Sequence, residues 1–153
     1  MTDFTVPETQ TKKVGDITLQ FAFRIDAEVE EQHDTTTSRG DRLFQRILGG
    51  TISGPLLNGT LHPRSGGEFG LGRADGAIEL NTHFMARTEH GEMLYVTHTG
   101  IRRDADGYFR FTAYFDAEGE GPHAWLNDTL IAGTGKPGPD GSNNMVFTYF
   151  VVG

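Results

Sequence analysis

Apolar and polar residues alternate with a period of two along much of the chain. The pattern is clearest in residues 17–25, where every second side chain is apolar, and it recurs in residues 107–119. This period is typical of β-strands that bury one face. Turn signals such as His90-Gly91 and Asp106-Gly107 separate the apolar runs about every eight to twelve residues. The pattern predicts an all-β fold, either an antiparallel barrel or a sandwich, with little helix.

Four segments depart from simple alternation. Residues 1–15 are expected to form an N-terminal arm, and only residues 122–128 could make a helical turn. Residues 28–42 are charged, rich in Thr and without an apolar period, so we expect an exposed connection, with a lid over a pocket as the alternative. Residues 145–152 are apolar on both faces, which predicts a covering segment or a subunit contact.

Composition narrows the classes of function. The chain has 153 residues, which suits one domain (1–153), and its formal net charge is −8. An acidic chain repels phosphate backbones, so nucleic acid is not an expected partner. There is no cysteine, and no apolar run approaches the roughly 20 residues that a membrane span needs. The N-terminus has neither the basic start nor the apolar stretch of a signal peptide, so we expect a cytoplasmic location.

A row of polar side chains lies in the predicted strand around residue 80. Residues two apart in a strand share a face, so Glu79, Asn81 and His83 point to one side, and Leu80 and Phe84 to the other. If the apolar set forms the core, the polar row is a solvated outer wall. If the barrel holds a ligand, the row can face inward and the apolar set can contact another subunit. We adopt the inward orientation as the hypothesis.

An inward row would favour general acid–base catalysis. An apolar cavity moves the pKa values of a carboxylate and an imidazole toward neutrality, so Glu79 and His83 are the candidate catalytic pair. Asn81, Tyr95 and Arg102 are candidates to hold a substrate oxygen. The remaining candidate substrate-binding residues are Arg73, His98, Arg110 and Trp125. Trp125 could instead be a plug at a barrel end, with Asn127 tying the turn through backbone hydrogen bonds.

Other kinds of site have weaker signals. No tight His-x-His motif is present, so no metal site is expected. No Gly-x-Ser-x-Gly elbow marks a serine nucleophile. The glycine-rich residues 67–72 are not preceded by a βαβ pattern, so a nucleotide loop is not expected. Asp75-Gly76 reads as a turn. We therefore expect no cofactor.

A series of short motifs in a fixed order resembles one family. They are Ile47-Leu-Gly49-Gly50, Gly54-Pro55, Gly59, Arg73-x-Asp75-Gly76, Tyr95-Val96, Gly100-x-Arg102, Tyr108-Phe109-Arg110 and Trp125-Leu126-Asn127. From about residue 17 to the end, the chain resembles the domain of unknown function 3237 family. The resemblance implies a compact barrel of the allene-oxide-cyclase or lipocalin kind, forming a homodimer or a larger homo-oligomer. It implies no established reaction.

The chain departs from that family within the polar row. Members usually read Asp-Ala-Arg-Tyr where this chain has Asn81-Thr82-His83-Phe84, and Thr-x-Pro where it has Phe111-Thr112-Ala113. A carboxylate has become an amide, and a permanent cation has become a titratable imidazole. If these positions line a pocket, this chain differs from its relatives in its chemistry.

Three functions are compatible with these patterns. The first is a cofactor-independent isomerase, cyclase or lyase that moves protons on a small hydrophobic, oxygenated molecule bound in the barrel. The second is a lipocalin-like protein that binds such a molecule without converting it. The third is an interaction module whose barrel is filled by Phe side chains. The chemistry suits an enzyme best, and the orientation of the polar row decides between them.

Overall fold

The alternating pattern corresponds to strands that make up most of the molecule. The computed structural model describes residues 11–153, and this part contains eleven β-strands, one short 3₁₀ helix and no α-helix. The elements are β1 (Thr11–Val14), β2 (Ile17–Val29), β3 (His33–Thr37), β4 (Gly40–Ser53), β5 (Gly59–Leu61), β6 (Gly66–Gly72), β7 (Ala77–Thr88), β8 (Met93–Arg103), β9 (Tyr108–Asp116), η1 (Ala124–Asp128), β10 (Ile131–Pro137) and β11 (Asn144–Val152).

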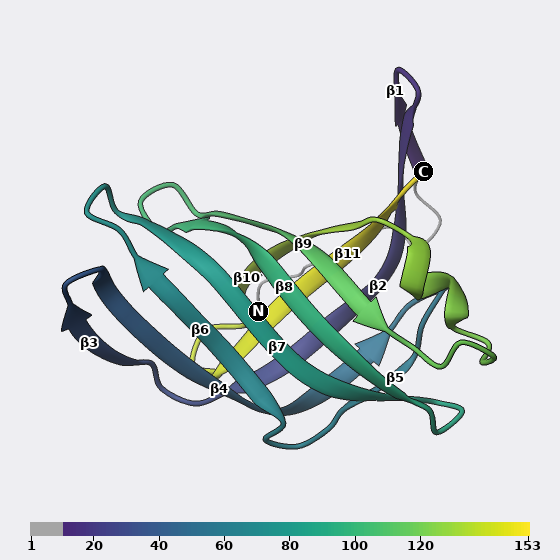
Figure 1. Ribbon diagram of the computed structural model, residues 1–153, viewed down its shortest axis with the longest axis horizontal. Helices are drawn as coiled ribbons and strands as arrows, with labels where there is room; N and C mark the ends of the chain where they lie inside the picture. The colour runs from purple at the N-terminus through teal and green to yellow at the C-terminus, as the bar shows by residue number, and fades with distance from the viewer. Residues whose placement is uncertain (1–10) are drawn as a thin grey trace.

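Eight of the strands close into an antiparallel barrel (Figure 1). Around the barrel the order is β2, β11, β10, β9, β8, β7, β6 and β4, and pairing between β4 and β2 closes the circle. β5 pairs with β4 and β7 beyond the end of β6, while β1 and β3 extend β2 and β4 outside the circle. The all-β barrel predicted from the sequence is confirmed.

The predicted turns join these strands. Gly91 and Gly107 adopt positive φ angles of 88° and 71° in the β7–β8 and β8–β9 turns, where glycine avoids a clash of the Cβ atom. The helical turn expected within residues 122–128 is η1, whose Leu126 is buried. Asn127 holds it in place: its Oδ1 accepts a hydrogen bond from the Ala117 N–H at 2.8 Å, and its Nδ2 donates to the Ala117 carbonyl at 3.0 Å.

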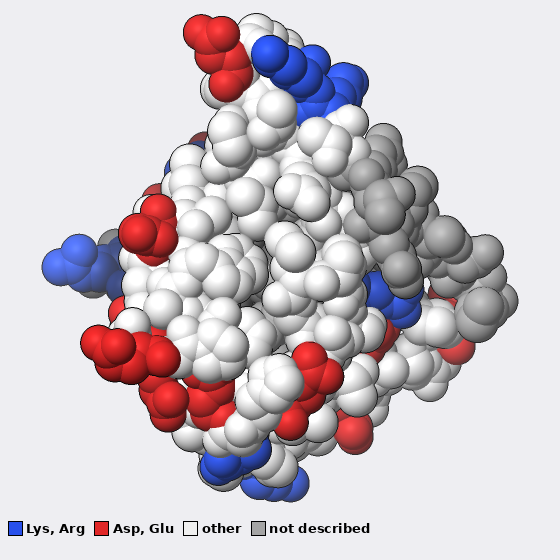
Figure 2. Space-filling model, turned by 90° about the vertical axis from the view of Figure 1, so that its right-hand side faces the viewer, with Lys and Arg blue, Asp and Glu red and all other residues white. Residues whose placement is uncertain are grey.

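The two ends of the barrel differ. At the plugged end, on the right in Figure 1, η1 and the β4–β5 connection cover the interior with Leu126 and Leu57. Figure 2 shows that the centre of this face is largely uncharged. At the other end, called the mouth below, lie the β6–β7, β8–β9 and β10–β11 turns. Two charged side chains, Glu68 and Arg102, line a hollow at this mouth.

The middle of the barrel is packed with aromatic rings. Six phenylalanines and Tyr149 belong to one buried cluster, made up of Phe23, Phe84, Phe109, Phe111, Phe115, Phe147 and Tyr149 with surrounding aliphatic residues. A closed barrel of eight strands is just wide enough to be filled in this way or to hold one small ligand. The third hypothesis, a barrel filled by Phe side chains, therefore describes the central part of the interior, and space for a ligand lies toward the mouth.

Most of segment 28–42 is exposed, as expected, although Val29 is buried, and the segment is not an irregular connection. Residues 33–37 form β3, which pairs with residues 40–44 of β4 in a hairpin beside the mouth. Thr residues favour extended backbone, so a polar strand can form without an apolar face. The N-terminal arm expected for residues 1–15 lies partly outside the described residues, and its described part contains β1. Neighbouring residues on opposite faces of β11, Val146 and Phe147, are both buried, and the covering segment or subunit contact expected for residues 145–152 stays a prediction.

Candidate functional site

Glu68 of β6 lines the mouth of the barrel. It is paired across the sheet with Thr82 of β7, whose side chain lies on the buried face. The Thr82 hydroxyl donates a hydrogen bond to Oε1 of Glu68 at 2.5 Å, and the Asn81 backbone N–H donates to Oε2 at 2.7 Å. Both carboxylate oxygens are therefore fixed in position, and their remaining lone pairs are available to a bound molecule.

The environment of Glu68 changes its acidity. Burial raises the pKa of this carboxyl above its ordinary value of 4.5, because the charged form loses solvation. The hydrogen bonds from Thr82 and Asn81 and the charges of Arg102 and His83 act in the opposite direction, but burial dominates. A carboxyl whose pKa lies closer to neutrality is a better proton acceptor and a more accessible proton donor.

Arg102 of β8 lies on the same side of the mouth. Its Nε and Nη2 donate to Asp104 at 2.6 and 3.4 Å, which leaves Nη1 without a hydrogen bond to any of residues 11–153. The guanidinium also lies 5.7 Å from the centre of the Phe109 ring. Arg102 therefore offers a fixed N–H donor for an oxygen atom entering the mouth.

Two neighbouring hollows share this arginine in their linings. The inner one is a cavity of about 20 Å³, large enough for a single water molecule. It is lined by Val29, Gln45, Ile47, Glu68, Thr82, Arg102, Phe109, Met145 and Phe147. The outer one has a volume of about 170 Å³ and shares Arg102, Phe109 and Met145 with the first. The two hollows therefore adjoin at the mouth, and Glu68 lines the inner one.

A histidine and a tyrosine, His98 and Tyr149, are fully buried among the aromatic rings of the barrel core. Nε2 of His98 lies 2.8 Å from the Tyr149 hydroxyl, and its ring stacks on Phe111 at 4.0 Å. Burial lowers the pKa of His98 from 6.5 to about 3 and raises that of Tyr149 well above 10. Both groups are thus neutral near pH 7. His98 was predicted to contact substrate, but it lies in the packed core.

The polar row of β7 does not face the interior. Glu79 and Asn81 are exposed on the outer wall, while Leu80, Thr82 and Phe84 point inward. The inward orientation assumed for this row is therefore wrong. The physical reason is simple: the alternate face is apolar, and burying it releases more water from apolar surface than burying the polar row would. Glu79 pairs with Arg73 at 3.4 Å, and neither reaches a cavity of the mouth.

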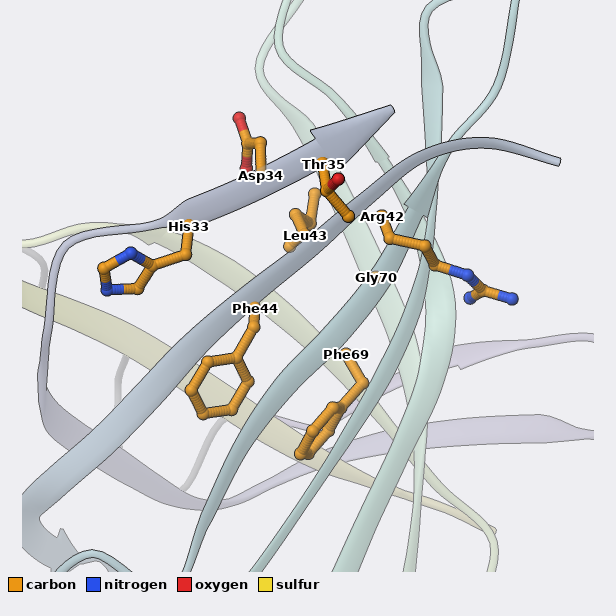
Figure 3. A pocket seen from close by; sticks show the side chains of 8 residues that line it. All are labelled: His33, Asp34, Thr35, Arg42, Leu43, Phe44, Phe69 and Gly70. Carbon is orange, nitrogen blue, oxygen red and sulfur yellow. The ribbon is translucent and has the colours of Figure 1, made fainter. Parts of the chain in front are cut away.

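His83 and Tyr95 also lie on the outer wall. The His83 ring stacks on Phe69 at 5.1 Å, and Tyr95 lies 6.3 Å from His83. The structure therefore brings His83 and Tyr95 near each other on the outer surface. Neither residue lines the cavity that Glu68 lines. A groove borders the same surface at β3, β4 and β6, and Figure 3 shows Phe44 and Phe69 side by side in it.

The other predicted residues are dispersed. Arg73 binds Asp75 at 2.8 Å in the β6–β7 turn, and Arg110 is exposed on β9, donating to the Phe109 carbonyl. Trp125 belongs to η1 and packs against the core at the plugged end, far along the barrel from the mouth. This is the plug position considered for it. Of the predicted substrate-binding residues, only Arg102 lines the mouth.

Residues 11–153 contain neither a metal-binding cluster nor a membrane-spanning helix. No group of three or more His, Asp or Glu side chains in this range lies close enough together to hold a metal ion. No helix in the same range is long and apolar enough to cross a membrane.

Sequence reasoning missed the central residue of the mouth. Glu68 stands in the Gly-rich run Gly66-Gly-Glu-Phe-Gly70, which we examined only as a nucleotide loop. A usable signal was Thr82, because it shares a face with Leu80 and Phe84. A buried hydroxyl requires a partner, and such a partner had to come from the neighbouring strand.

Solved structures share this fold. A beta-barrel like protein from Acinetobacter baumannii is 20% identical, with a TM-score of 0.78 over 92% of this chain and 99% of that one. A protein of unknown function from Clostridium acetobutylicum is 21% identical, with a TM-score of 0.79 over 90% and 100%. An enzyme from Penicillium herquei is 23% identical, with a TM-score of 0.73 over 93% and 98%. At these identities the likeness establishes the fold alone.

The family is established by the sequence match. No curated protein matches the chain. A family model described as "Protein of unknown function (DUF3237)" matches residues 17–152, which is nearly the whole chain. The chain therefore belongs to the DUF3237 family, as its motifs predicted.

Proposed function

We propose that the chain is a cofactor-independent enzyme that moves protons on a small oxygenated molecule bound at the mouth of the barrel. The observation that carries the proposal is the Glu68 carboxylate, which is held through both oxygens beside Arg102. A partly buried carboxyl at an open hollow, with its pKa raised, is frequent among general acid–base residues. One protein of this fold is described as an enzyme, which is compatible with a catalytic role.

Each residue of the mouth has a distinct role in this mechanism. Glu68 takes a proton from a carbon atom next to a carbonyl group, which leaves an enolate and a neutral carboxyl. Arg102 donates a hydrogen bond to the enolate oxygen and stabilises its charge. Glu68 then returns the proton to another atom of the same molecule, so the net reaction is an isomerisation. Thr82 and Asn81 keep the carboxylate oriented throughout.

The shape of the mouth limits the substrate. The cavity beside Glu68 admits only a small group, because its volume is about 20 Å³. The body of the substrate must occupy the outer hollow against Phe109 and Met145. These walls favour a compact, partly apolar molecule with one carbonyl group.

The test is proton exchange on enolisable probes. A panel of small ketones and β-dicarbonyl compounds is incubated with the protein in D₂O, and the loss of the α-proton signal is followed by NMR. Glu68→Gln is expected to slow the protein-dependent exchange by roughly 10²-fold or more. Glu79→Gln, a matched change on the outer wall, is expected to leave it unchanged.

The same experiment separates catalysis from binding alone. A probe that binds at the mouth without exchange in the wild type would favour the lipocalin-like alternative. Equal loss of exchange in Glu68→Gln and Glu79→Gln would contradict the role given to Glu68.

A further inference from the structure

A groove on the outer wall of the barrel is separate from the mouth. It lies where β3, β4 and β6 run side by side, and its volume of about 460 Å³ falls within the usual range for small-molecule sites. Its walls are His33, Asp34, Thr35, Arg42, Leu43, Phe44, Phe69 and Gly70 (Figure 3). None of these residues lines the cavity that contains Glu68.

Strand pairing arranges the groove in two rows. His33 pairs with Phe44, which pairs with Phe69, so these three rings share one face of the sheet. The neighbouring row, two residues along, places Arg42 on the same face. Adjacent rows lie roughly 6.5–7 Å apart. The groove therefore presents an aromatic row and, beside it, a cation.

The aromatic row continues across the barrel wall. Phe44 and Phe69 lie 5.0 Å apart, and Phe69 stacks on His83 at 5.1 Å with an angle of 19° between the rings. Phe69 is 41% exposed despite these contacts. Stacked rings with an exposed face offer a planar ligand both apolar burial and favourable ring geometry.

The charge in the groove is not neutralised by the protein. Arg73, Arg102 and Arg103 are each paired with an aspartate two or three residues away. The Arg42 side chain is exposed and has no hydrogen bond or ion pair to any of residues 11–153. The acid nearest in sequence, Asp41, accepts a hydrogen bond from Thr36, and Asp34 accepts one from Gln32. In Figure 3 the Asp34 carboxylate points away from the two Phe rings.

We propose that this groove binds a small aromatic carboxylate, with its ring on Phe44 and Phe69 and its carboxylate on Arg42. An unpaired guanidinium favours a planar anion, because it can donate two parallel hydrogen bonds to a carboxylate. The spacing between the two rows suits a ring joined to its carboxylate by a short carbon arm. The chain as a whole has a net charge of −8, but the unpaired guanidinium makes this groove locally positive. The groove therefore favours an aromatic anion over a cationic or a purely apolar ligand.

The experiment uses three probes that separate ring from charge. 3-Phenylpropanoate carries both features, 3-phenylpropanamide keeps the ring without the charge, and propanoate keeps the charge without the ring. Each is titrated to millimolar concentration into ¹⁵N-labelled protein, and backbone amide shifts are followed. We expect saturable shifts in β3, β4 and β6 with 3-phenylpropanoate, and binding roughly tenfold weaker or more for each of the other two.

Variants assign the contacts. Arg42→Gln and Phe69→Ser are each expected to weaken binding of 3-phenylpropanoate by roughly tenfold. Arg39→Gln is the matched control, because Arg39 is an exposed arginine of the same hairpin that does not line the groove. Glu68→Gln should bind the probe as the wild type does, so the outcome is independent of the function proposed for the mouth.

Four results would overturn the proposal. They are the absence of saturable shifts with 3-phenylpropanoate, equal affinities in Arg42→Gln and Arg39→Gln, shifts confined to residues that line the mouth, and a self-associated protein that covers Phe69 and excludes the probe. Sedimentation velocity on the NMR sample identifies the last of these.

Discussion

Two titratable groups of the barrel, His98 and Glu68, lie in contrasting surroundings. The His98 ring is enclosed by aromatic rings, and Tyr149 is its one hydrogen-bond partner among residues 11–153. Glu68 is held by two donors but faces an open hollow. Burial suppresses the charged form of both groups, yet of the two only Glu68 lines a hollow. The comparison teaches that a shifted pKa indicates chemistry only where the group is also accessible.

The largest effect should come from the packed region. Phe84 is buried against His98 and the core, whereas Phe69 is exposed on the outer wall. Phe84→Ala is expected to lower the free energy of unfolding by about 3–5 kcal/mol, because it leaves a cavity. Phe69→Ala should lower it by less than about 1 kcal/mol. Urea unfolding measures both, and similar losses would contradict the assignment of inner and outer faces.

The next effect is the pH dependence caused by His98. The pKa of this group falls from 6.5 in the unfolded chain to about 3 in the fold. Its stabilising contribution is complete above pH 6.5 and is lost as the pH falls toward 3, by a few kcal/mol. His98→Leu should therefore lose less stability than the wild type between neutral pH and about pH 4. The free energy of unfolding in urea is measured against pH for both proteins. Identical slopes for the wild type and His98→Leu would show that the pKa of His98 is not lowered by burial.

A smaller effect tests the partner of His98. Tyr149→Phe keeps the ring and removes the hydroxyl that lies 2.8 Å from Nε2. The imidazole then has an unsatisfied buried nitrogen, and we expect a loss of about 1–3 kcal/mol. Tyr114→Phe is the control, since Tyr114 is 56% exposed. An equal, negligible loss in both variants would mean that the buried hydrogen bond contributes little.

The smallest expected effect is the pH dependence of stability caused by Glu68 at the mouth. Its sign is opposite to that of the pH dependence caused by His98. Because the pKa of Glu68 is raised, its contribution to stability is complete below pH 4.5 and is lost as the pH rises through the folded value. Relative to the wild type, Glu68→Gln should become more stable as the pH rises from acid to neutral. Thermal unfolding across this range provides the measurement. If the stability of Glu68→Gln minus that of the wild type falls or stays constant as the pH rises, the raised pKa of Glu68 would be contradicted.

Most of the fold could be predicted because strands and turns leave local signals. The period of two located β2 and β9, and the glycines at 91 and 107 marked two turns correctly. β3 was missed because its Thr-rich sequence has no apolar face, and its formation depends on pairing with β4. Local pattern cannot reveal an element that is stabilised by its neighbour.

The candidate site could be predicted only in part. Arg102, predicted to hold a substrate oxygen, lines the mouth, but the acid that lines the same cavity is Glu68 rather than Glu79. Applied to β7 alone, the alternation of Leu80 and Phe84 with polar residues would have placed Glu79 outside. The position of Glu68 depended on the register between β6 and β7, which sets it opposite Thr82. A register between strands is a long-range property, and one sequence does not define it.

The most direct test of the account is the titration of the Glu68 carboxyl itself. Carbon-13 NMR of the side-chain carboxyl, assigned by comparison with Glu68→Gln, measures its pKa in the folded protein. The account predicts a value above the ordinary 4.5, because the barrel wall removes water from the carboxylate. A value at or below 4.5 would contradict it, since Glu68 would then be a solvated or simply ion-paired acid without the environment that the proposed chemistry requires.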